Sequence, residues 1–379
     1  MKRLTKKILI TLYYYHPYVS GVSINAKRVA EGLAKRGHKV TVLTSRFDKT
    51  LPQKEVINGV EVIRRPVLMK FGKGVIMPTF WLDILRYARA YDYINPHLPM
   101  NDSAISSLFI SKDKIITTYQ CDIFLGNGLL DRLLSFVSIS LMKLQLNRSK
   151  VVISSSMDYL EHSKMKKYAY KAQAIGPTIT VPEFHNISST EFFNNLKVQQ
   201  DEVKIGFVGR IVYEKGINFL LDSMPYLNKS IKKYKIVIVG DYSNVAGGSI
   251  KDQLDNYIKL YPDKIIFTGY LSDKDRNRFY SGIDVLVLPS IDPLEAYGMV
   301  QIEAMLCGTP VVASNLPGVR QIVRNTGYGR ICKTKNAKDI ANQIVEVVIN
   351  PHKYKPNRDK VAKMYDPQAG FDIYESLMP

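Results

Sequence analysis

Two carboxylates and two cations occupy positions where they could bind a charged, oxygen-rich ligand. Glu295 and Glu303 lie eight residues apart, one before and one within an expected helix. Arg210 and Lys215 lie five residues apart, where an apolar strand gives way to another expected helix. A guanidinium and an ammonium can converge on one diphosphate, and carboxylates can accept hydrogen bonds from sugar or ribose hydroxyls. These residue types therefore indicate a site for a diphosphate and a sugar.

The carboxylates belong to a segment that reads strand, loop, helix, strand. Residues 284–288 and 310–313 are short β-branched runs of the kind found in buried parallel strands. Between them, residues 299–306 are rich in helix formers, and Gly308 follows where a helix would end. This order predicts a βαβ unit in a parallel sheet.

The start of that helix is the part of the unit that could hold a ligand. If the helix begins near Gly298, the backbone N–H groups of residues 297–300 point outward at the carboxyl edge of the sheet. Such groups suit a phosphate or a sugar oxygen. The alternative is structural: Glu295 caps the helix and Glu303 is a solvated residue on its surface.

Two segments together carry a family resemblance. Residues 295–303, EAYGMVQIE, followed by AMLCGTPVV, resemble the E-x7-E segment of retaining glycosyltransferases of family 4, which have the GT-B fold. Residues 207–216 resemble the same family's V-G-R and K-G pattern. The resemblance spans almost the whole chain. It implies an α/β protein of two doubly wound, Rossmann-like domains that face each other across a cleft.

The resemblance also implies a reaction. A hexose would move from a UDP- or GDP-linked sugar to an acceptor hydroxyl, with retention of anomeric configuration. Arg210 and Lys215 would neutralise the charge that develops on the leaving diphosphate, so no metal and no cofactor is expected. The chain also has no Asp-x-Asp motif at a strand end. Since no carboxylate stands where a covalent nucleophile would be needed, departure and attack on the same face is the expected course.

Further residues receive roles from the same resemblance. The expected catalytic residues are His97, Arg210, Lys215 and Glu295. The expected donor-binding residues are Gly21, Gly209, Arg210, Lys215, Gly240, Tyr270, Leu271, Glu295, Tyr297, Gly298, Met299, Val300 and Glu303. The expected acceptor-side residues are His16, Gln120 and Asp122. His97 is placed in a Pro-rich loop after a strand over 92–95, where a histidine can equally be a structural residue.

The chain departs from the family pattern at several positions. Ser20 replaces the first of two glycines before the first helix, and Tyr242 replaces the second glycine of a G-x-G turn. Gln120 stands where relatives often have histidine, and a neutral amide cannot take a proton as a general base. Asp122 could orient the acceptor hydroxyl or cap the turn that follows it.

Length and periodicity predict the domain organisation. A chain of 379 residues exceeds what one hydrophobic core usually serves. Strands and helices alternate in two runs, which predicts one domain over 1–183 and a second over 184–365. The resemblance implies that the first is the acceptor-side domain and the second binds the nucleotide sugar. The apolar spacing in 366–379 predicts a tail helix, and the resemblance implies that it packs back on the first domain.

The charge of the chain is unevenly distributed. Of the net charge of +19, residues 1–178 hold +16, with 28 Lys and Arg against 12 Asp and Glu. No nucleic-acid module is recognisable, so an anionic membrane surface bearing a lipid-linked or glycan acceptor is the expected partner. The alternative is a solvated basic face. The cations that could dock on such a membrane are Lys2, Arg3, Lys6, Lys70, Lys73, Lys164, Lys166 and Lys167.

Other features bear on location. The three cysteines show no metal-ligand or disulfide spacing, which favours a reducing compartment. No apolar run approaches the roughly 18 to 20 residues of a transmembrane helix. The apolar helix expected over 129–146 is interpreted as part of the core. The alternative is that it adds an apolar face to the surface that docks on the membrane. A cytoplasmic protein is expected, with peripheral attachment to the inner face of the cell membrane.

Two other functions fit the same fold. A nucleotide-sugar 2-epimerase would need acid and base groups on the sugar ring instead of an acceptor cleft. A non-catalytic subunit that binds a sugar nucleotide would not need all of Arg210, Lys215, Glu295 and Glu303. Transfer of label from a nucleotide sugar to a new product separates the three functions.

Overall fold

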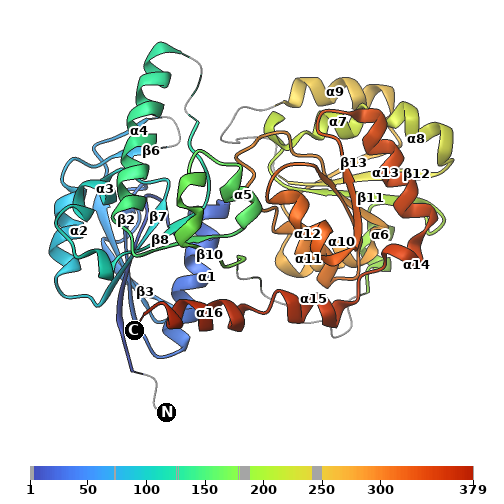
Figure 1. The fold of residues 1–379 in the computed structure, drawn as a ribbon. Helices are drawn as coiled ribbons and strands as arrows, with labels where there is room; N and C mark the ends of the chain where they lie inside the picture. The colour runs from blue at the N-terminus through green and yellow to red at the C-terminus, as the bar shows by residue number, and fades with distance from the viewer. Residues whose placement is uncertain are drawn as a thin grey trace. The chain divides into compact units, whose positions relative to one another are not determined.

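The chain divides into two compact units. The computed structural model describes residues 4–71, 74–124, 126, 128–177, 179, 188–240 and 250–378. The first unit comprises Met1–Thr178 with Pro367–Pro379, and the second comprises Ile179–Asp366 (Figure 1). The last segment of the chain therefore belongs to the same unit as the first.

The first unit is built on an eight-stranded sheet in the order β10-β9-β8-β7-β1-β2-β4-β3. Its strands are β1 Lys7–Thr11, β2 Lys39–Arg46, β3 Lys54–Ile57, β4 Val60–Pro66, β7 Tyr93–Leu98, β8 Ile116–Tyr119, β9 Val151–Ser154 and β10 Ala172–Ala174. All neighbours are parallel except β3 and β4, and β5 Met69–Phe71 pairs with β6 Gly74–Ile76 in a separate hairpin. The helices are α1 Gly21–Lys35, α2 Phe80–Ala88, α3 Asp102–Ser107, α4 Leu129–Asn147, α5 Met157–Glu161 and α16 Pro367–Ser376, with 3₁₀ turns η1 Lys112–Lys114 and η2 Lys166–Lys171.

The second unit is built on a six-stranded parallel sheet in the order β13-β12-β11-β14-β15-β16. Its strands are β11 Val203–Val208, β12 Tyr234–Val239, β13 Ile265–Gly269, β14 Val285–Leu288, β15 Val311–Ser314 and β16 Gly329–Cys332. Its helices are α6 Thr190–Asn195, α7 Ile217–Leu221, α8 Met224–Ser230, α9 Lys251–Leu260, α10 Asp273–Gly282, α11 Val300–Leu306, α12 Val319–Thr326, α13 Ala337–Ile349, α14 Pro351–Tyr354 and α15 Arg358–Met364, with the 3₁₀ turn η3 Tyr213–Lys215. The predicted α/β class with two doubly wound sheets is confirmed.

Each face of the second sheet is buried under helices. Along β12, Ile236 and Ile238 contribute to one hydrophobic cluster, and Val237 and Val239 contribute to the other. Alternate residues of a strand point to opposite faces, so both faces need apolar side chains. This is why the strands of this unit read as continuous apolar runs in the sequence.

One predicted element boundary is wrong in a way that matters for the site. The sequence places His97 in a loop after a strand over 92–95, whereas β7 continues to Leu98. The strand continues because His97 pairs with Thr118, and Leu98 with Tyr119, on the neighbouring strand β8. The prolines in this segment suggested a loop, but the pairing with β8 decides the conformation.

The expectation that the helix over 129–146 is buried is wrong for its first half. Leu129, Leu133 and Phe136 of α4 are 86%, 59% and 69% exposed. Deeper along the helix, Met142 and Leu146 are fully buried. Only the second half of α4 therefore belongs to the core of the first unit.

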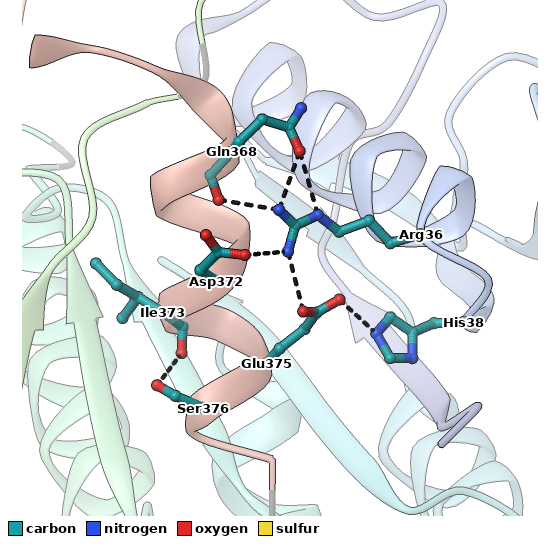
Figure 2. Close-up of polar contacts among 7 residues, drawn as sticks. All are labelled: Arg36, His38, Gln368, Asp372, Ile373, Glu375 and Ser376. Carbon is teal, nitrogen blue, oxygen red and sulfur yellow. Dashed lines mark hydrogen bonds and ion pairs between the residues drawn. The ribbon is translucent and has the colours of Figure 1, made fainter. Parts of the chain in front are cut away.

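The tail helix α16 packs on α1 within the first unit. Arg36, the residue after α1, donates to the backbone carbonyl of Gln368 at 3.2 Å and to the carboxylates of Asp372 at 2.7 Å and Glu375 at 2.9 Å. Glu375 also bonds His38 at 3.1 Å, as Figure 2 shows. Charge-assisted hydrogen bonds of this kind are stronger than neutral ones. One guanidinium therefore joins three residues of α16 to the end of α1.

The apolar side of the tail helix packs where α1 has a glycine instead of a side chain. A Cβ at Gly32 would lie 1.8 Å from Cζ of Phe371, so the glycine leaves the space that the ring fills. Phe371 and Tyr374 are buried in the core of the first unit. The apolar spacing that predicted a docked tail helix therefore corresponds to these buried side chains.

Candidate active site

The order of the second sheet identifies its most favourable binding edge. Strand β11 lies between β12 and β14, so the connections from β11 and β14 leave the sheet in opposite directions. In open parallel sheets, ligands bind outside the carboxyl ends of the strands at such a switch point. The loops after these two strands, residues 209–216 and 289–299, contain the two cations and Glu295.

These two loops contact each other closely. The backbone N–H of Ile291 donates to the carbonyl of Glu214 at 3.0 Å. Gly216 has φ +67°, and a Cβ there would lie 2.0 Å from the carbonyl oxygen of Pro289. Glycine adopts this conformation readily, and it alone leaves room for the neighbouring carbonyl. The contact fixes the position of Lys215 relative to the second loop.

Lys215 and Glu295 form an ion pair across the two loops. The Lys215 Nζ contacts the Glu295 Oε2, and the two side chains are 20% and 18% exposed. Ser290 Oγ lies 3.5 Å from the same carboxylate oxygen. Partial burial strengthens this pair relative to a fully exposed one. Two residues that lie 80 positions apart in the sequence therefore meet at the switch point.

Arg210 extends from the end of β11 with more of its side chain in solvent. Its Nη2 lies 4.0 Å from the Glu214 carboxylate, and its side chain is 44% exposed. The preceding residue, Gly209, bonds through its N–H to the Val239 carbonyl at 3.0 Å. A Cβ at Gly240 would lie 1.9 Å from the Gly209 carbonyl oxygen. The glycines at the ends of β11 and β12 therefore allow their backbones to approach closely beside Arg210.

Glu303 is held by a residue of α10. The buried Tyr280 hydroxyl donates to Glu303 Oε2 at 3.1 Å, and Arg276 Nε lies 3.9 Å from the same oxygen. Burial and the neighbouring carboxylate raise the pKa of Tyr280 well above its usual value, so the phenol stays protonated and serves as a donor. Glu303 is therefore oriented by a donor that the sequence analysis did not single out.

The segment before α11 is shaped by Gly298. This residue has φ +78°, and a Cβ there would lie 2.5 Å from Leu288 Cδ2 and 2.8 Å from Gln301 Nε2. The Gln301 amide donates to the carbonyls of Tyr297 and Val319 at 3.2 and 3.1 Å. The helix itself begins at Val300 with Met299 as its N-cap, close to the predicted start.

The remaining donor-side residues lie after β12, β13 and β14. Tyr270 follows β13 and is 78% exposed, and Leu271 beside it is half-buried. Tyr297 is buried, and its burial raises the pKa of its hydroxyl. Asp241 and Tyr242, which form the departure from the G-x-G turn, lie outside the described residues.

His97 of the first unit belongs to a buried polar network. Its Nε2 lies 2.9 Å from Asn95 Oδ1, and Gln120 Nε2 donates to its Nδ1 at 2.8 Å. Asn95 uses its amide nitrogen to donate to the Ile116 carbonyl and to Thr118 Oγ1, so its oxygen is the acceptor for His97. These partners assign the neutral tautomer of His97 with hydrogen on Nε2.

Two family models match this chain. The model described as glycosyl transferases group 1 matches residues 188–364, and the model described as Glycosyltransferase Family 4 matches residues 19–164. The chain belongs to the group 1 glycosyltransferases. This confirms the family predicted from the segment between Glu295 and Glu303.

Individual relatives agree with this family. The chain is 29% identical over 356 residues to an uncharacterized glycosyltransferase of Methanocaldococcus jannaschii, a match that covers 88% of this chain and 87% of the relative. It is 25% identical over 355 residues to alpha-monoglucosyldiacylglycerol synthase of Streptococcus pneumoniae, covering 88% and 76%. The structure resembles HepE of Anabaena, solved in complex with UDP-glucose, with a TM-score of 0.71, 18% identity and coverage of 98% and 99%. The predicted GT-B fold is confirmed.

In this glycosyltransferase, the acceptor-side candidates of the first unit have different surroundings. Asp122 accepts from the Tyr119 hydroxyl at 2.7 Å and from the backbone N–H of Lys164 at 3.0 Å. His16 is exposed, and its carbonyl accepts from Arg64 at 2.9 Å. Both oxygens of Asp122 therefore tie neighbouring segments together, while the His16 imidazole lies at the surface.

The loop after β1 ends in a well-formed helix start. Ser20 is the N-cap of α1, and its Oγ accepts from the Ser23 N–H at 3.1 Å. Gly21 is the first helical residue, and no atom lies within 4 Å of the place where its Cβ would be. The serine that replaces a family glycine therefore satisfies a backbone donor of α1 that would otherwise lack a partner.

Two residues that were not predicted, Asn95 and Tyr280, orient two of the predicted site residues. Asn95 bonds His97, and Tyr280 bonds Glu303. A signal for Asn95 was present, because a single amide inside an apolar strand needs a buried partner. Among the residues that the structure describes, no group of three His, Cys, Asp or Glu side chains could hold a metal ion.

The buried state of His97 predicts an acid-dependent loss of stability. Burial lowers the pKa of its imidazole from 6.5 to about 3, so between these values the unfolded chain binds a proton that the folded chain excludes. His97 therefore contributes to the free energy of unfolding at pH 7, and this contribution is lost as the pH falls. We expect the difference in unfolding free energy between wild type and His97→Gln to shrink by about 2 kcal/mol between pH 7 and pH 5.

Urea titrations of the two proteins at both pH values measure this difference. His16→Gln, at an exposed position, is the matched control and should follow the wild type at both pH values. A His97→Gln variant whose difference from wild type is the same at pH 7 and pH 5 would show that His97 is not buried in its neutral form.

Proposed function

We propose that this glycosyltransferase moves a hexose from a UDP- or GDP-linked sugar to the hydroxyl of a lipid-linked or glycan acceptor, with retention of configuration. The observation that carries the proposal is the meeting of Lys215 and Glu295 at the switch point of the second sheet, with Arg210 on the same loop as Lys215. Support for the donor comes from HepE, which was solved in complex with UDP-glucose. Support for a lipid comes from the name of the pneumococcal relative, a synthase of a glucosyldiacylglycerol.

In this proposal, the two cations serve the leaving group. Negative charge grows on the diphosphate as the bond to the sugar breaks. Arg210 and Lys215 would stabilise that charge, which is the kind of preorganised electrostatic term that lowers barriers most. Glu295 would hold Lys215 in place and accept from a sugar hydroxyl. Glu303, oriented by Tyr280, would accept from the ribose hydroxyls. No metal ion is required for these roles.

The donor's remaining contacts are proposed to be made largely by backbone. Gly209, Gly240 and Gly298 let the chain pass close to the nucleotide without a Cβ. The N–H groups of Met299 and Val300 would face the sugar and the diphosphate. Tyr297 would support this segment from the buried side, and Tyr270 with Leu271 would flank the base.

The first unit is proposed to hold the acceptor and to contribute residues to donor binding. Gly21 would allow a close backbone approach to the diphosphate. We propose that His97 is a neutral residue of this site, held in place by Asn95 and Gln120, because its lowered pKa makes it a poor proton carrier at neutral pH. His16 would line the acceptor side, and Asp122, which accepts from the backbone N–H of Lys164, would support the segment that follows β8.

The proposed acceptor lies at a membrane. Among the described residues, no helix is both long enough and apolar enough to cross a bilayer. Lys70, Lys164, Lys166 and Lys167 are exposed, whereas Lys2, Arg3 and Lys73 lie outside the described residues. We propose that cations of the first unit attract the anionic inner face of the cell membrane, where each well-placed cation contributes about 1 kcal/mol.

A donor panel tests the proposed function. The protein is incubated with radiolabelled UDP- and GDP-hexoses and a lipid extract, with and without EDTA. We expect label in a lipid product from one donor, in equal yield with the chelator, and an anomeric configuration that matches the donor. Label that remains in a nucleotide sugar of changed configuration would indicate a 2-epimerase. Donor binding without turnover would indicate a binding subunit, and activity restored only by Mg²⁺ or Mn²⁺ would overturn the metal-free mechanism.

A further inference from the structure

Helix α4 exposes its apolar side chains and buries polar ones. Five residues of its first half are between 44% and 86% exposed and are called here the α4 ridge: Leu129, Leu130, Leu133, Phe136 and Val137. On the opposite side, Ser138 is only 4% exposed and accepts from Asn101 Nδ2 at 3.1 Å. A helix that packs on a core normally shows the reverse arrangement.

The ridge forms one continuous stripe. Its members are spaced at i, i+1, i+4, i+7 and i+8, the spacing that places side chains on one face of a helix. Figure 1 shows α4 extending away from the sheet of the first unit. Single exposed apolar residues are common, but a contiguous apolar patch marks an interaction surface. The ridge therefore calls for an apolar partner.

Cationic segments adjoin both ends of α4. The Lys164 ammonium donates to the Ile123 carbonyl at 3.5 Å, which places it beside the segment that leads into α4. The next residue, Phe124, is 57% exposed. The Tyr168 hydroxyl donates to the Lys143 carbonyl at 2.9 Å, so η2 lies against α4.

Further exposed cations lie on α4 and on the neighbouring 3₁₀ turn η2. Besides Lys164, the exposed cations on α4 and η2 are Arg132, Lys143, Lys166 and Lys167. Apolar side chains next to lysines match a bilayer interface, where acyl chains lie beneath anionic headgroups. Residues 1–178 as a whole also carry a net positive charge, with 28 Lys and Arg against 12 Asp and Glu, which is the charge that an anionic bilayer attracts.

We propose that the α4 ridge inserts into the interface of an anionic lipid bilayer, while the lysines beside it contact lipid phosphates. The ridge covers nine residues, or about 13 Å of helix, and an interfacial helix sinks about 5–10 Å into the headgroup and acyl boundary. This inference rests on the proposed lipid-linked acceptor, because insertion keeps the first unit at the surface where that acceptor is found. The ridge would thus insert into the membrane, in addition to the electrostatic attraction between the cations of the first unit and the anionic lipids.

Binding to vesicles tests the ridge. The probes are phosphatidylcholine vesicles with and without 30% phosphatidylglycerol. The variant is Leu133→Ser combined with Phe136→Ser. Its control is Leu260→Ser combined with Ile349→Ser, which removes two apolar residues that are 67% and 64% exposed on helices of the second unit. We expect the ridge variant to bind anionic vesicles about tenfold or more weakly than wild type. The control should bind as wild type does.

Further readouts separate this inference from its rivals. Lys166→Glu with Lys167→Glu should weaken anionic binding and reduce its dependence on salt. In Phe136→Trp, the new indole should show blue-shifted emission with anionic vesicles and quenching by brominated lipids. Unchanged vesicle binding by the ridge variant would overturn the inference. So would sedimentation showing that the wild type is a dimer and the ridge variant a monomer, because the ridge would then bind a second copy.

Transfer to a detergent-dispersed acceptor distinguishes failure of the inference from failure of the proposed function. We expect the ridge variant to transfer sugar normally to an acceptor in detergent and poorly to the same acceptor in vesicles. Normal transfer in both settings would overturn the ridge and leave the transferase intact. Loss of vesicle binding by the ridge variant, with no transfer by wild type in either setting, would support the ridge and refute the proposed reaction.

Discussion

Lys215→Ala should lower kcat by about 30- to 1000-fold, the loss expected when about 2 to 4 kcal/mol of transition-state stabilisation is removed. In the structure, Lys215 is held against Glu295 at the carboxyl edge of the second sheet. The ammonium is thus in place before the donor binds, and its interaction with the diphosphate strengthens as the charge develops. Donor affinity should fall less than kcat, because the ground state carries less charge at the breaking bond. Arg210→Ala should change kcat in the same direction.

Steady-state kinetics with the donor found in the panel measure this effect. Lys233→Ala is the matched control, since Lys233 also forms an ion pair, at 2.6 Å with Asp201, but both side chains are largely exposed. It should leave kcat unchanged. Lys215→Arg retains the charge without the compact ammonium and should recover part of the activity. A Lys215→Ala variant with near wild-type kcat would refute the assignment of Lys215 to the diphosphate.

The sequence predicted those parts of the site that lie within one βαβ unit. Residues 285–288 and 311–314 are buried on both faces, so their apolar runs stand out in the sequence. Glu295 and Glu303 flank the start of the intervening helix α11, and their spacing is set by local structure alone. Local hydrophobic pattern was therefore sufficient to place both carboxylates.

The sequence could not predict contacts that depend on how the strands are ordered. The ion pair between Lys215 and Glu295 exists because β11 and β14 are neighbours in the sheet. The network of His97 and Gln120 exists because β7 and β8 are neighbours. In both cases the partners lie on, or directly after, different strands, and the periodicity of one strand does not reveal which strand lies beside it.

Helix α4 shows a different limit of sequence reasoning. The spacing of Leu129, Leu133 and Phe136 correctly places them on one face of a helix. It does not say whether that face turns toward the core or toward solvent. Burial is the usual outcome for such a stripe, and the contact of Ser138 with Asn101 decides against it here. The position of a helix on its domain is a tertiary property.

Gly216→Ala should destabilise the second unit by about 3 kcal/mol and lower activity as well. The substituted residue would have to keep φ near +67°, which costs an L-residue about 1 to 2 kcal/mol. Its Cβ would also lie 2.0 Å from the Pro289 carbonyl oxygen and 2.9 Å from the carbonyl carbon. These are backbone atoms that cannot rotate away, so the loops after β11 and β14 must separate, with an overpacking cost of about 1 to 3 kcal/mol. Separation of these loops would move Lys215 away from Glu295.

Gly327→Ala separates the two causes of this effect. Gly327 has φ +73°, and no atom lies within 4 Å of the place where its Cβ would be. It therefore carries the cost of the left-handed backbone without the collision, and denaturant titration should show a loss of only about 1 to 2 kcal/mol with unchanged kcat. The excess loss in Gly216→Ala then measures the contact with Pro289. Equal losses in the two variants, or full activity of Gly216→Ala, would show that the two loops do not depend on this contact to hold Lys215 against Glu295.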